Sequence, residues 1–117
     1  MSDDAFLESY LEAALWSSIS DFGEPLDYSY TIDDFTPEAL GAAKKDCEGF
    51  KKLAGPLLDD LDETQVAHDF WLTRNGHGAG FWDGDYEQSV GEQLTKIANS
   101  FGDVYLFVNS DDLIEYE

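Results

Sequence analysis

Apolar residues recur at helical spacing in four separate stretches of this chain, and each stretch is bounded by residues that begin or end helices. The first helix is predicted over residues 3–17, with Ser2 as its cap and acidic residues in its first turn. The second begins at Thr36-Pro37, a cap followed by a proline, and ends before Gly55-Pro56. The third is expected over residues 63–74 and the fourth from residue 86 or 88 to residue 101, each followed by a glycine.

The last part of the chain has a β pattern. The segments VYLFV and LIEY flank the four residues NSDD, and this arrangement predicts an antiparallel hairpin. The segment YSYTI, residues 28–32, is expected to add a short strand within an otherwise irregular stretch. About four helices packed with a small antiparallel sheet that ends in a C-terminal hairpin predict an α+β fold.

Length and composition predict one domain. A chain of 117 residues is long enough for one hydrophobic core and too short for two, so a single compact acidic domain over residues 1–117 is expected. The apolar content of 43%, with 15% aromatic residues, suffices for a packed interior and excludes a disordered acidic tail. Cys47 is the only cysteine, so we expect it to pack in the core rather than to form a disulfide.

No targeting or membrane segment is predicted. No apolar run approaches the roughly 20 residues that span a bilayer. The first residues, MSDDAFLESY, lack the basic and apolar regions of a signal peptide. The sequence therefore predicts an intracellular protein that does not enter a membrane.

Charge is the strongest global property of the chain. There are 26 acidic residues against 6 basic ones, which gives a formal net charge of −20. A domain of this size has a diameter of about 35 Å, and duplex DNA of that length carries about 20 phosphates. Such a surface repels nucleic acid and anionic membranes and favours a basic partner, either a nucleic-acid-binding protein or a cation. Solubility and adaptation to high salt are the alternatives, although five lysines to one arginine speak against salt adaptation.

Residues 68–83, HDFWLTRNGHGAGFWD, differ from the rest of the chain. They hold both histidines, two of the three tryptophans, the only arginine and a glycine at every second position from Gly76 to Gly80. Such glycines supply positive φ angles or close backbone approach, which serve either a ligand or a tight chain reversal. The spacing fits neither a dinucleotide fingerprint nor a phosphate loop, since it follows a helix and lacks the Gly-Lys-Ser/Thr ending.

Metal and catalytic patterns are weak. The run from Asp83 to Glu87 has the spacing of a calcium loop but lacks its glycine and its bidentate glutamate, so that motif is rejected. His68 and His77 with Asp83 or Asp85 are left open as a two-histidine carboxylate site, but no metal or cofactor is predicted. No Ser or Cys has a recognisable activating partner, so no catalytic residue is assigned and an enzyme is not expected.

The simplest interpretation of this segment is that it stabilises the fold rather than binding a ligand. Arg74 is expected to form a bidentate pair that holds the glycine loop, with Asp83 or Asp69 as its partner. An aromatic core is expected beneath it, made of Phe70, Trp71, Phe81 and Trp82.

The block HDFWLTRNGHGAGFWD, with the amphipathic helix and the short β segment after it, resembles a family of small acidic proteins of phages and prophages that have no assigned function. The similarity is strong over residues 68–83, moderate from there to residue 107 and weak before residue 60. The resemblance implies a location in the cytoplasm of an infected or lysogenic bacterial cell, and it implies no catalytic residues. Small, strongly acidic phage proteins often resemble DNA mimics that inhibit host restriction or CRISPR enzymes.

These observations predict a non-enzymatic, phage-type inhibitor that mimics DNA and binds a basic host protein, with no direct binding of nucleic acid. The residues expected to contact that partner are Asp33, Asp34, Asp59, Asp60, Asp62, Glu63, Asp111 and Asp112. The alternative is a small-molecule, peptide or metal-binding protein, conceivably an enzyme, with a site formed by His68, Arg74, His77 and Asp83. An acidic accessory protein without mimicry is a third hypothesis.

Overall fold

The computed structural model describes residues 2–19, 23–76, 80–81 and 86–117. Within these ranges the main elements are α1 (Ser2–Ser17), α2 (Pro37–Ala54), α3 (Glu63–Arg74), α4 (Gln88–Asn99), β1 (Leu106–Val108) and β2 (Ile114–Tyr116). Three short 3₁₀ helices are η1 (Leu26–Tyr28), η2 (Ile32–Asp34) and η3 (Gly55–Leu58). Four helices and a two-stranded antiparallel sheet confirm the predicted α+β class. None of the helices in the described ranges is both long and apolar enough to cross a membrane.

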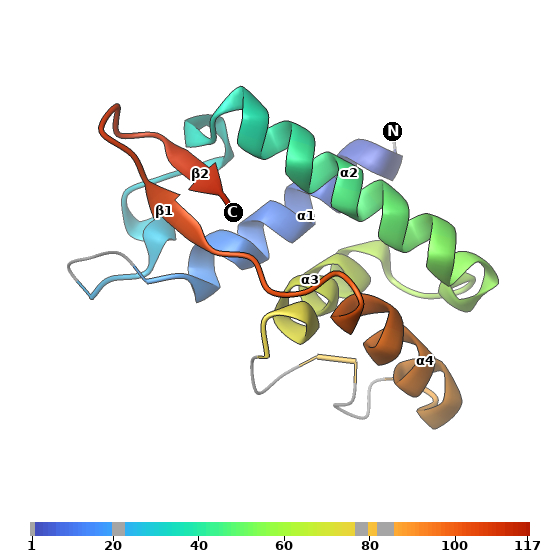
Figure 1. The fold of residues 1–117 in the computed structure, drawn as a ribbon. Coiled ribbons are helices and arrows are strands. Elements are labelled where there is room, and N and C mark those ends of the chain that lie inside the picture. The colour runs from blue at the N-terminus through green and yellow to red at the C-terminus, as the bar shows by residue number, and fades with distance from the viewer. Residues whose placement is uncertain (1, 20–22, 77–79, 82–85) are drawn as a thin grey trace.

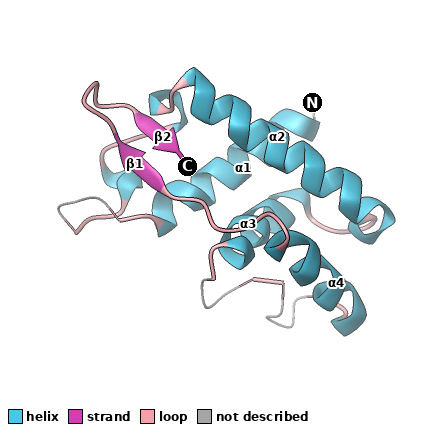
Figure 2. Cartoon of the chain, in the orientation of Figure 1, coloured by secondary structure: helices cyan, strands magenta, loops and turns pink. Residues whose placement is uncertain are grey.

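The helices pack around α3 and the hairpin lies against α2 (Figures 1 and 2). Helix α1 packs mainly on α3, and α4 packs on the other side of α3. Strand β2 contacts α2, and its Ile114 forms a parallel bridge with Phe35, just before that helix begins. The hairpin is therefore fixed beside the first turn of α2, whereas η3 and the loop after it lie at the opposite end of that helix.

The helix boundaries follow from their caps. The Thr36 hydroxyl accepts a hydrogen bond from the Ala39 N–H at 3.0 Å at the start of α2, and the Asp62 carboxylate accepts from the Thr64 N–H at 2.9 Å at the start of α3. These side chains satisfy backbone donors that a helix leaves without partners at its first turn. Because the cap residues are visible in the sequence, the predicted start of both helices is confirmed.

The short strand expected over residues 28–32 is wrong. That stretch contains the end of η1 and the start of η2. The Thr31 hydroxyl accepts from the Asp33 N–H at 3.3 Å, while the Asp34 carboxylate accepts from the Thr31 N–H at 2.8 Å. Such a reciprocal capping box satisfies the backbone locally, and it replaces the hydrogen bonds that a neighbouring strand would supply.

Stacked aromatic rings form the centre of the core. The Phe70 ring lies 4.2 Å from the Phe50 ring and 5.1 Å from the Tyr10 ring, measured between centroids. The Phe81 ring also stacks on Phe50, with 5.8 Å between centroids. Phe70, Trp71 and Phe81 are all buried, as predicted, whereas Trp82 lies outside the described residues. The buried Cys47 also packs in the core, which confirms its structural role.

Two helical glycines provide a test of the packing around Phe81. A Cβ added at Gly91, inside α4, would lie 2.5 Å from the backbone oxygen of Phe81, which cannot move aside as a side chain can. We therefore expect Gly91→Ala to lower the free energy of unfolding by about 1–3 kcal/mol. A Cβ added at Gly41, inside α2, would have no atom outside the helix's own backbone within 4 Å. Gly41→Ala should therefore raise the free energy of unfolding by about 0.5–1 kcal/mol. Urea unfolding of both variants measures these changes, and a loss of stability at both positions would contradict the packing described.

Candidate functional site

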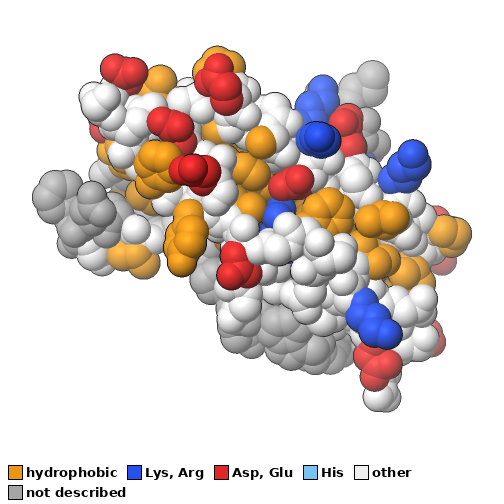
Figure 3. Space-filling model, in the orientation of Figure 1, with side chains coloured by type: hydrophobic (Ala, Val, Ile, Leu, Met, Phe, Trp, Pro, Cys, Tyr) orange, Lys and Arg blue, Asp and Glu red, His pale blue; other side chains and the backbone are white. Residues whose placement is uncertain are grey.

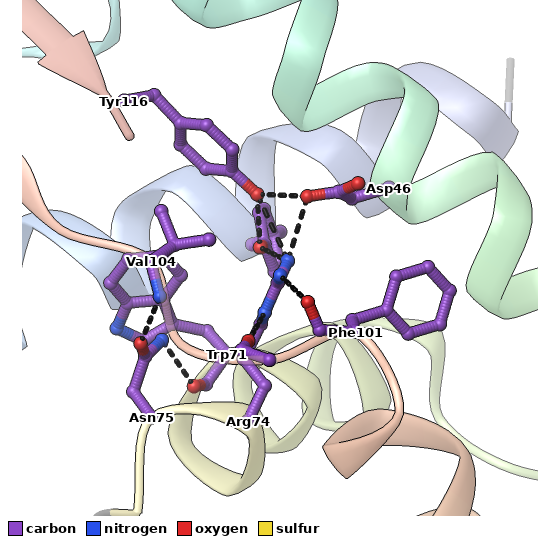
Figure 4. Close-up of polar contacts among 9 residues, drawn as sticks. Asp46, Trp71, Arg74, Asn75, Phe101, Val104 and Tyr116 are labelled. Carbon is purple, nitrogen blue, oxygen red and sulfur yellow. Dashed lines mark hydrogen bonds and ion pairs between the residues drawn. The ribbon is translucent and has the colours of Figure 1, made fainter.

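Arg74 is buried at the end of α3, and its guanidinium bonds to four other parts of the chain (Figure 4). Its Nε donates to the carbonyl oxygen of Gly102 at 2.8 Å, and Nη2 donates to that of Phe101 at 2.8 Å. Its Nη1 lies 2.8 Å from a carboxylate oxygen of Asp46 in α2. The same Nη1 donates to the hydroxyl of Tyr116 at 3.1 Å, and that hydroxyl donates to Asp46 at 2.6 Å. Nη1 also donates to the hydroxyl of Tyr10 in α1 at 2.9 Å. The guanidinium therefore connects α3 with α1, α2, β2 and the segment after α4.

Asp69, one of the two expected partners of Arg74, is wrong. The ion pair is made with one oxygen of Asp46 rather than in bidentate fashion with Asp69, whose carboxylate accepts a hydrogen bond from Tyr86. Asp69 precedes Arg74 by five positions, and at 3.6 residues per turn the two side chains leave α3 on different faces. Asp83 lies outside the described residues. Because the donors of Arg74 are used within the fold, we interpret this group as a scaffold. Among the described residues it holds residues 101–102, and most of the glycine loop lies outside the described residues.

The pKa values around Arg74 predict a loss of stability in alkali. Burial raises the pKa of Tyr10 and of Tyr116 from the ordinary value of 10.0, and it raises that of Cys47 from 9.0. The folded protein keeps these protons while the unfolded chain loses them, so the stabilisation is complete below pH 9 and decreases as the pH rises above it. We expect a decrease of about 1.4 kcal/mol per pH unit for each ionising group. Urea unfolding at pH 8, 9, 10 and 10.5 measures this, and an unchanged stability would contradict it.

The structure separates the eight acidic residues predicted to bind a partner into two groups. The first group comes together because η2 and the hairpin loop meet near the start of α2, and its members are Asp33, Asp34, Asp111 and Asp112. Two hydrogen bonds join these segments: the Tyr30 hydroxyl donates to Asp112 at 2.6 Å, and the Thr36 N–H donates to the carbonyl oxygen of Ile114 at 3.0 Å. The second group, Asp59, Asp60, Asp62 and Glu63, follows η3 at the other end of α2. The 18 residues of α2 separate the two groups by about 27 Å, at about 1.5 Å per residue.

Several of these acids also shape the backbone. Asp34 closes the capping box at Thr31, and Asp62 caps α3. Asp60 and Asp112 have φ angles of 67° and 63°, a left-handed conformation that Asp and Asn adopt more readily than most residues. The positions of these acids are thus explained in part by turn formation. A substitution that tests their charge should be Asp→Asn, which keeps the turn and capping geometry.

Positive charge is confined to one part of the molecule. Every lysine and arginine of the chain lies between residues 44 and 96, with four lysines on α2 and one on α4. We call the region formed by Asp27, Asp33, Asp34, Asp111 and Asp112 the acidic end, and it contains no lysine or arginine. In Figure 3 the exposed blue side chains lie over α2 and α4, and none lies at the hairpin end of this face. The second acidic group is partly neutralised, since Glu63 pairs with Lys51 at 3.5 Å.

A cavity of about 580 Å³ lies beside the acidic end and contains His68. Its walls come from four elements or the turns next to them: α1, η1, η2 and α3. The described residues that line it are Glu8, Glu12, Leu15, Trp16, Asp27, Tyr30, Thr31, Ile32, Asp33 and His68. Four carboxylates, two aromatic rings and one imidazole therefore surround a space of the size that small ligands occupy.

The cavity unites one residue from each of the two predicted sites. Asp33 belongs to the acidic group expected to bind a partner, and His68 belongs to the alternative ligand site. The structure does not bring His68 and Arg74 together, because Arg74 is engaged at Asp46 and does not line the cavity. His77 and Asp83, the other members of the alternative site, lie outside the described residues.

Sequence reasoning missed the α1 side of this cavity. Glu8, Glu12 and Trp16 are spaced by four residues, so they lie on one stripe of α1. This stripe is exposed, and Trp16 retains 44% of its accessible surface. A tryptophan placed between the apolar and the acidic face of a predicted helix was the available signal for a binding surface.

Neither a search for metal ligands nor comparison with known proteins assigns a function to these residues. Among the residues that the structure describes, no group of three or more His, Cys, Asp or Glu side chains converges closely enough to hold a metal ion. Comparison of the chain with protein-family models, with curated proteins and with solved structures found no match.

Proposed function

We propose that this protein is a non-enzymatic, phage-type interaction protein that binds a basic protein whose usual ligand is nucleic acid. The observation that carries the proposal is the separation of charge. The acidic end presents carboxylates from η1, η2 and the hairpin loop, and all lysines lie elsewhere. A surface of one sign attracts an oppositely charged partner and raises the rate of association, while it repels nucleic acid itself.

The dimensions of the molecule favour mimicry of DNA over a single charged contact. The longest extent of the chain is 43 Å, close to the length of about 12 base pairs at roughly 3.4 Å each. The two acidic groups lie at opposite ends of α2, so carboxylates are distributed along the molecule rather than at one point. A groove that binds phosphates along a duplex would meet carboxylates over a similar length. By occupying such a groove with its carboxylates, the protein would inhibit a restriction or CRISPR enzyme.

The proposal predicts competition with DNA and a strong dependence on salt. The immobilised protein should retain basic nucleic-acid enzymes from a bacterial lysate at low salt, and a duplex oligonucleotide should release them because both ligands use the same groove. Raising the salt from about 50 to 300 mM should weaken the retention steeply, since screening shortens the range of the attraction. The free protein should respond in the opposite direction, with a higher melting temperature at high salt, because its carboxylates repel one another.

Beads coated with polyglutamate of matched charge provide the control for simple ion exchange. A partner that binds through shape as well as charge should be retained by the protein at salt concentrations that strip it from polyglutamate. The proposal is contradicted if no nucleic-acid-binding protein is retained, or if the retained proteins are indifferent to competing duplex.

A further inference from the structure

The walls of the cavity at the acidic end carry negative charge from three elements. Glu8 and Glu12 lie on one stripe of α1, and like charges at this spacing destabilise a helix unless a cation lies near them. Asp27 of η1 and Asp33 of η2 add two further carboxylates to the lining. No lysine or arginine is among the described residues that line the cavity. The cavity therefore favours a positively charged occupant.

The same walls also provide aromatic and apolar surface. Trp16 is 44% exposed and its side chain lines the cavity, and Leu15 and Ile32 add aliphatic surface. Tyr30 is held in place by the hydrogen bond from its hydroxyl to Asp112 at 2.6 Å. An indole face attracts ammonium and guanidinium groups more strongly than the other aromatic rings do. Carboxylates beside an exposed indole are a recurrent arrangement for the recognition of organic cations.

His68 gives an independent indication that the cavity is incomplete without an occupant. Its Nε2 is buried and has no hydrogen-bond partner among the residues that the structure describes. The His68 ring lies nearly perpendicular to the Trp16 ring, with 6.5 Å between the ring centroids, so the imidazole packs beside the indole in the cavity wall. Buried polar atoms in folded proteins are rarely left without a partner. The unsatisfied nitrogen therefore belongs to a residue of the cavity wall whose polar contacts are incomplete among the described residues.

A metal ion does not fit the arrangement of the described side chains. Four carboxylates and one imidazole line the cavity, yet no three of the described His, Cys, Asp or Glu groups converge closely enough to ligate one ion. Charges distributed around a space of about 580 Å³ match a larger cation whose charge is spread over several atoms or carried on a stem.

We propose that this cavity binds an organic cation, a guanidinium or alkylammonium group carried on a flexible aliphatic stem. The charged group lies between the α1 carboxylates and Asp33, against the indole of Trp16, and the stem lies against Leu15 and Ile32. The cation can come from a basic side chain of a protein partner or from a free polyamine, and the two sources share this chemistry.

Titrations with small probes test the assignment. N-acetyl-arginine methylamide represents a protein side chain, spermidine represents a free polyamine, and N-acetyl-citrulline methylamide is the neutral counterpart of the first. We expect the cations to shift the NMR signals of the Trp16 indole N–H and of the backbone amides of residues 31–33 saturably, with a dissociation constant on the order of 1 mM. Citrulline should not shift them. Tighter binding of the blocked arginine assigns the cavity to a protein side chain, and tighter binding of spermidine assigns it to a polyamine.

Two variants locate the site and one serves as the control. Trp16→Leu and Glu12→Gln should each weaken cation binding about threefold to tenfold, as judged from the amides of residues 31–33. Glu48→Gln removes an exposed carboxylate of α2 that does not line the cavity, so it should leave binding unchanged. Thermal melts verify that all three variants fold.

The proposal is overturned if the cations cause no saturable shift, if citrulline binds as well as arginine, or if Glu48→Gln weakens binding as much as Glu12→Gln. These titrations need no macromolecular partner. Their failure therefore leaves the proposed binding of a basic protein intact, and failure of the lysate experiment leaves the cation site intact.

Discussion

Replacing Arg74 by methionine should lower the free energy of unfolding by about 3–5 kcal/mol, because the change removes one member of a buried ion pair and the donors to two backbone carbonyls. The carbonyl oxygens of Phe101 and Gly102 would each lose a hydrogen bond of 2.8 Å, and Asp46 would lose its counter-ion. Methionine fills a similar volume, so the loss reports the missing hydrogen bonds and charge rather than a large cavity. Urea unfolding measures the change.

The matched controls separate charge from geometry. Arg74→Lys keeps the positive charge but offers a single nitrogen, which cannot reach two backbone carbonyls and Asp46 together, so we expect it to recover only part of the stability. Lys96→Met removes an exposed cation from α4 and should change the free energy of unfolding by less than about 0.5 kcal/mol. Full stability of Arg74→Met would show that the network around it does not hold α2, α3 and residues 101–102 together.

The helices were predictable because their signals are local. The third helix was predicted over residues 63–74 and is observed as Glu63–Arg74, since an acidic cap precedes it and Asn75-Gly76 follows it. The hairpin was predictable for the same reason, because two β-rich segments flank a turn sequence. The prediction at residues 28–32 failed because of local hydrogen bonding. Aromatic and β-branched residues there indicated a strand, but the capping box at Thr31 favours 3₁₀ turns.

The partner of Arg74 could not be predicted, because it depends on packing between distant parts of the chain. Asp46 lies 28 residues before Arg74 and is one of 26 acidic residues, so nothing in its neighbourhood marks it as the counter-ion. Proximity in the sequence favoured Asp69, which leaves α3 on a different face. A single arginine in an acidic chain predicts that an ion pair exists but does not identify which carboxylate makes it.

The cavity beside the acidic end was only partly predictable for a related reason. Its lining comes from α1, η1, η2 and α3, and the sequence does not show that these elements converge. His68 and Asp33 were each identified as candidate residues, but for two different sites. The stripe of Glu8, Glu12 and Trp16 was visible in the helical periodicity, and an exposed tryptophan beside two glutamates is the pattern that we would now interpret as a site for a cation.

Neutralising each acidic group separately, and measuring binding to a partner that duplex DNA releases, tests whether the acidic end recognises that partner. One variant carries Asn at positions 33, 34, 111 and 112, and its matched control carries Asn at 59, 60 and 62 and Gln at 63. Asn retains the cap at Asp34 and the left-handed turn at Asp112, so the first variant should keep its fold and lose only charge. Thermal melts check this.

We expect the variant at positions 33, 34, 111 and 112 to bind the partner about a hundredfold more weakly, because four partner cations lose their carboxylates. The control should lose less affinity for the partner, since Glu63 is already paired with Lys51. Affinities measured at one fixed low salt concentration by biolayer interferometry compare the two. A folded variant that lacks the four charges and still binds with unchanged affinity would contradict the claim that the acidic end is the surface that recognises the basic partner.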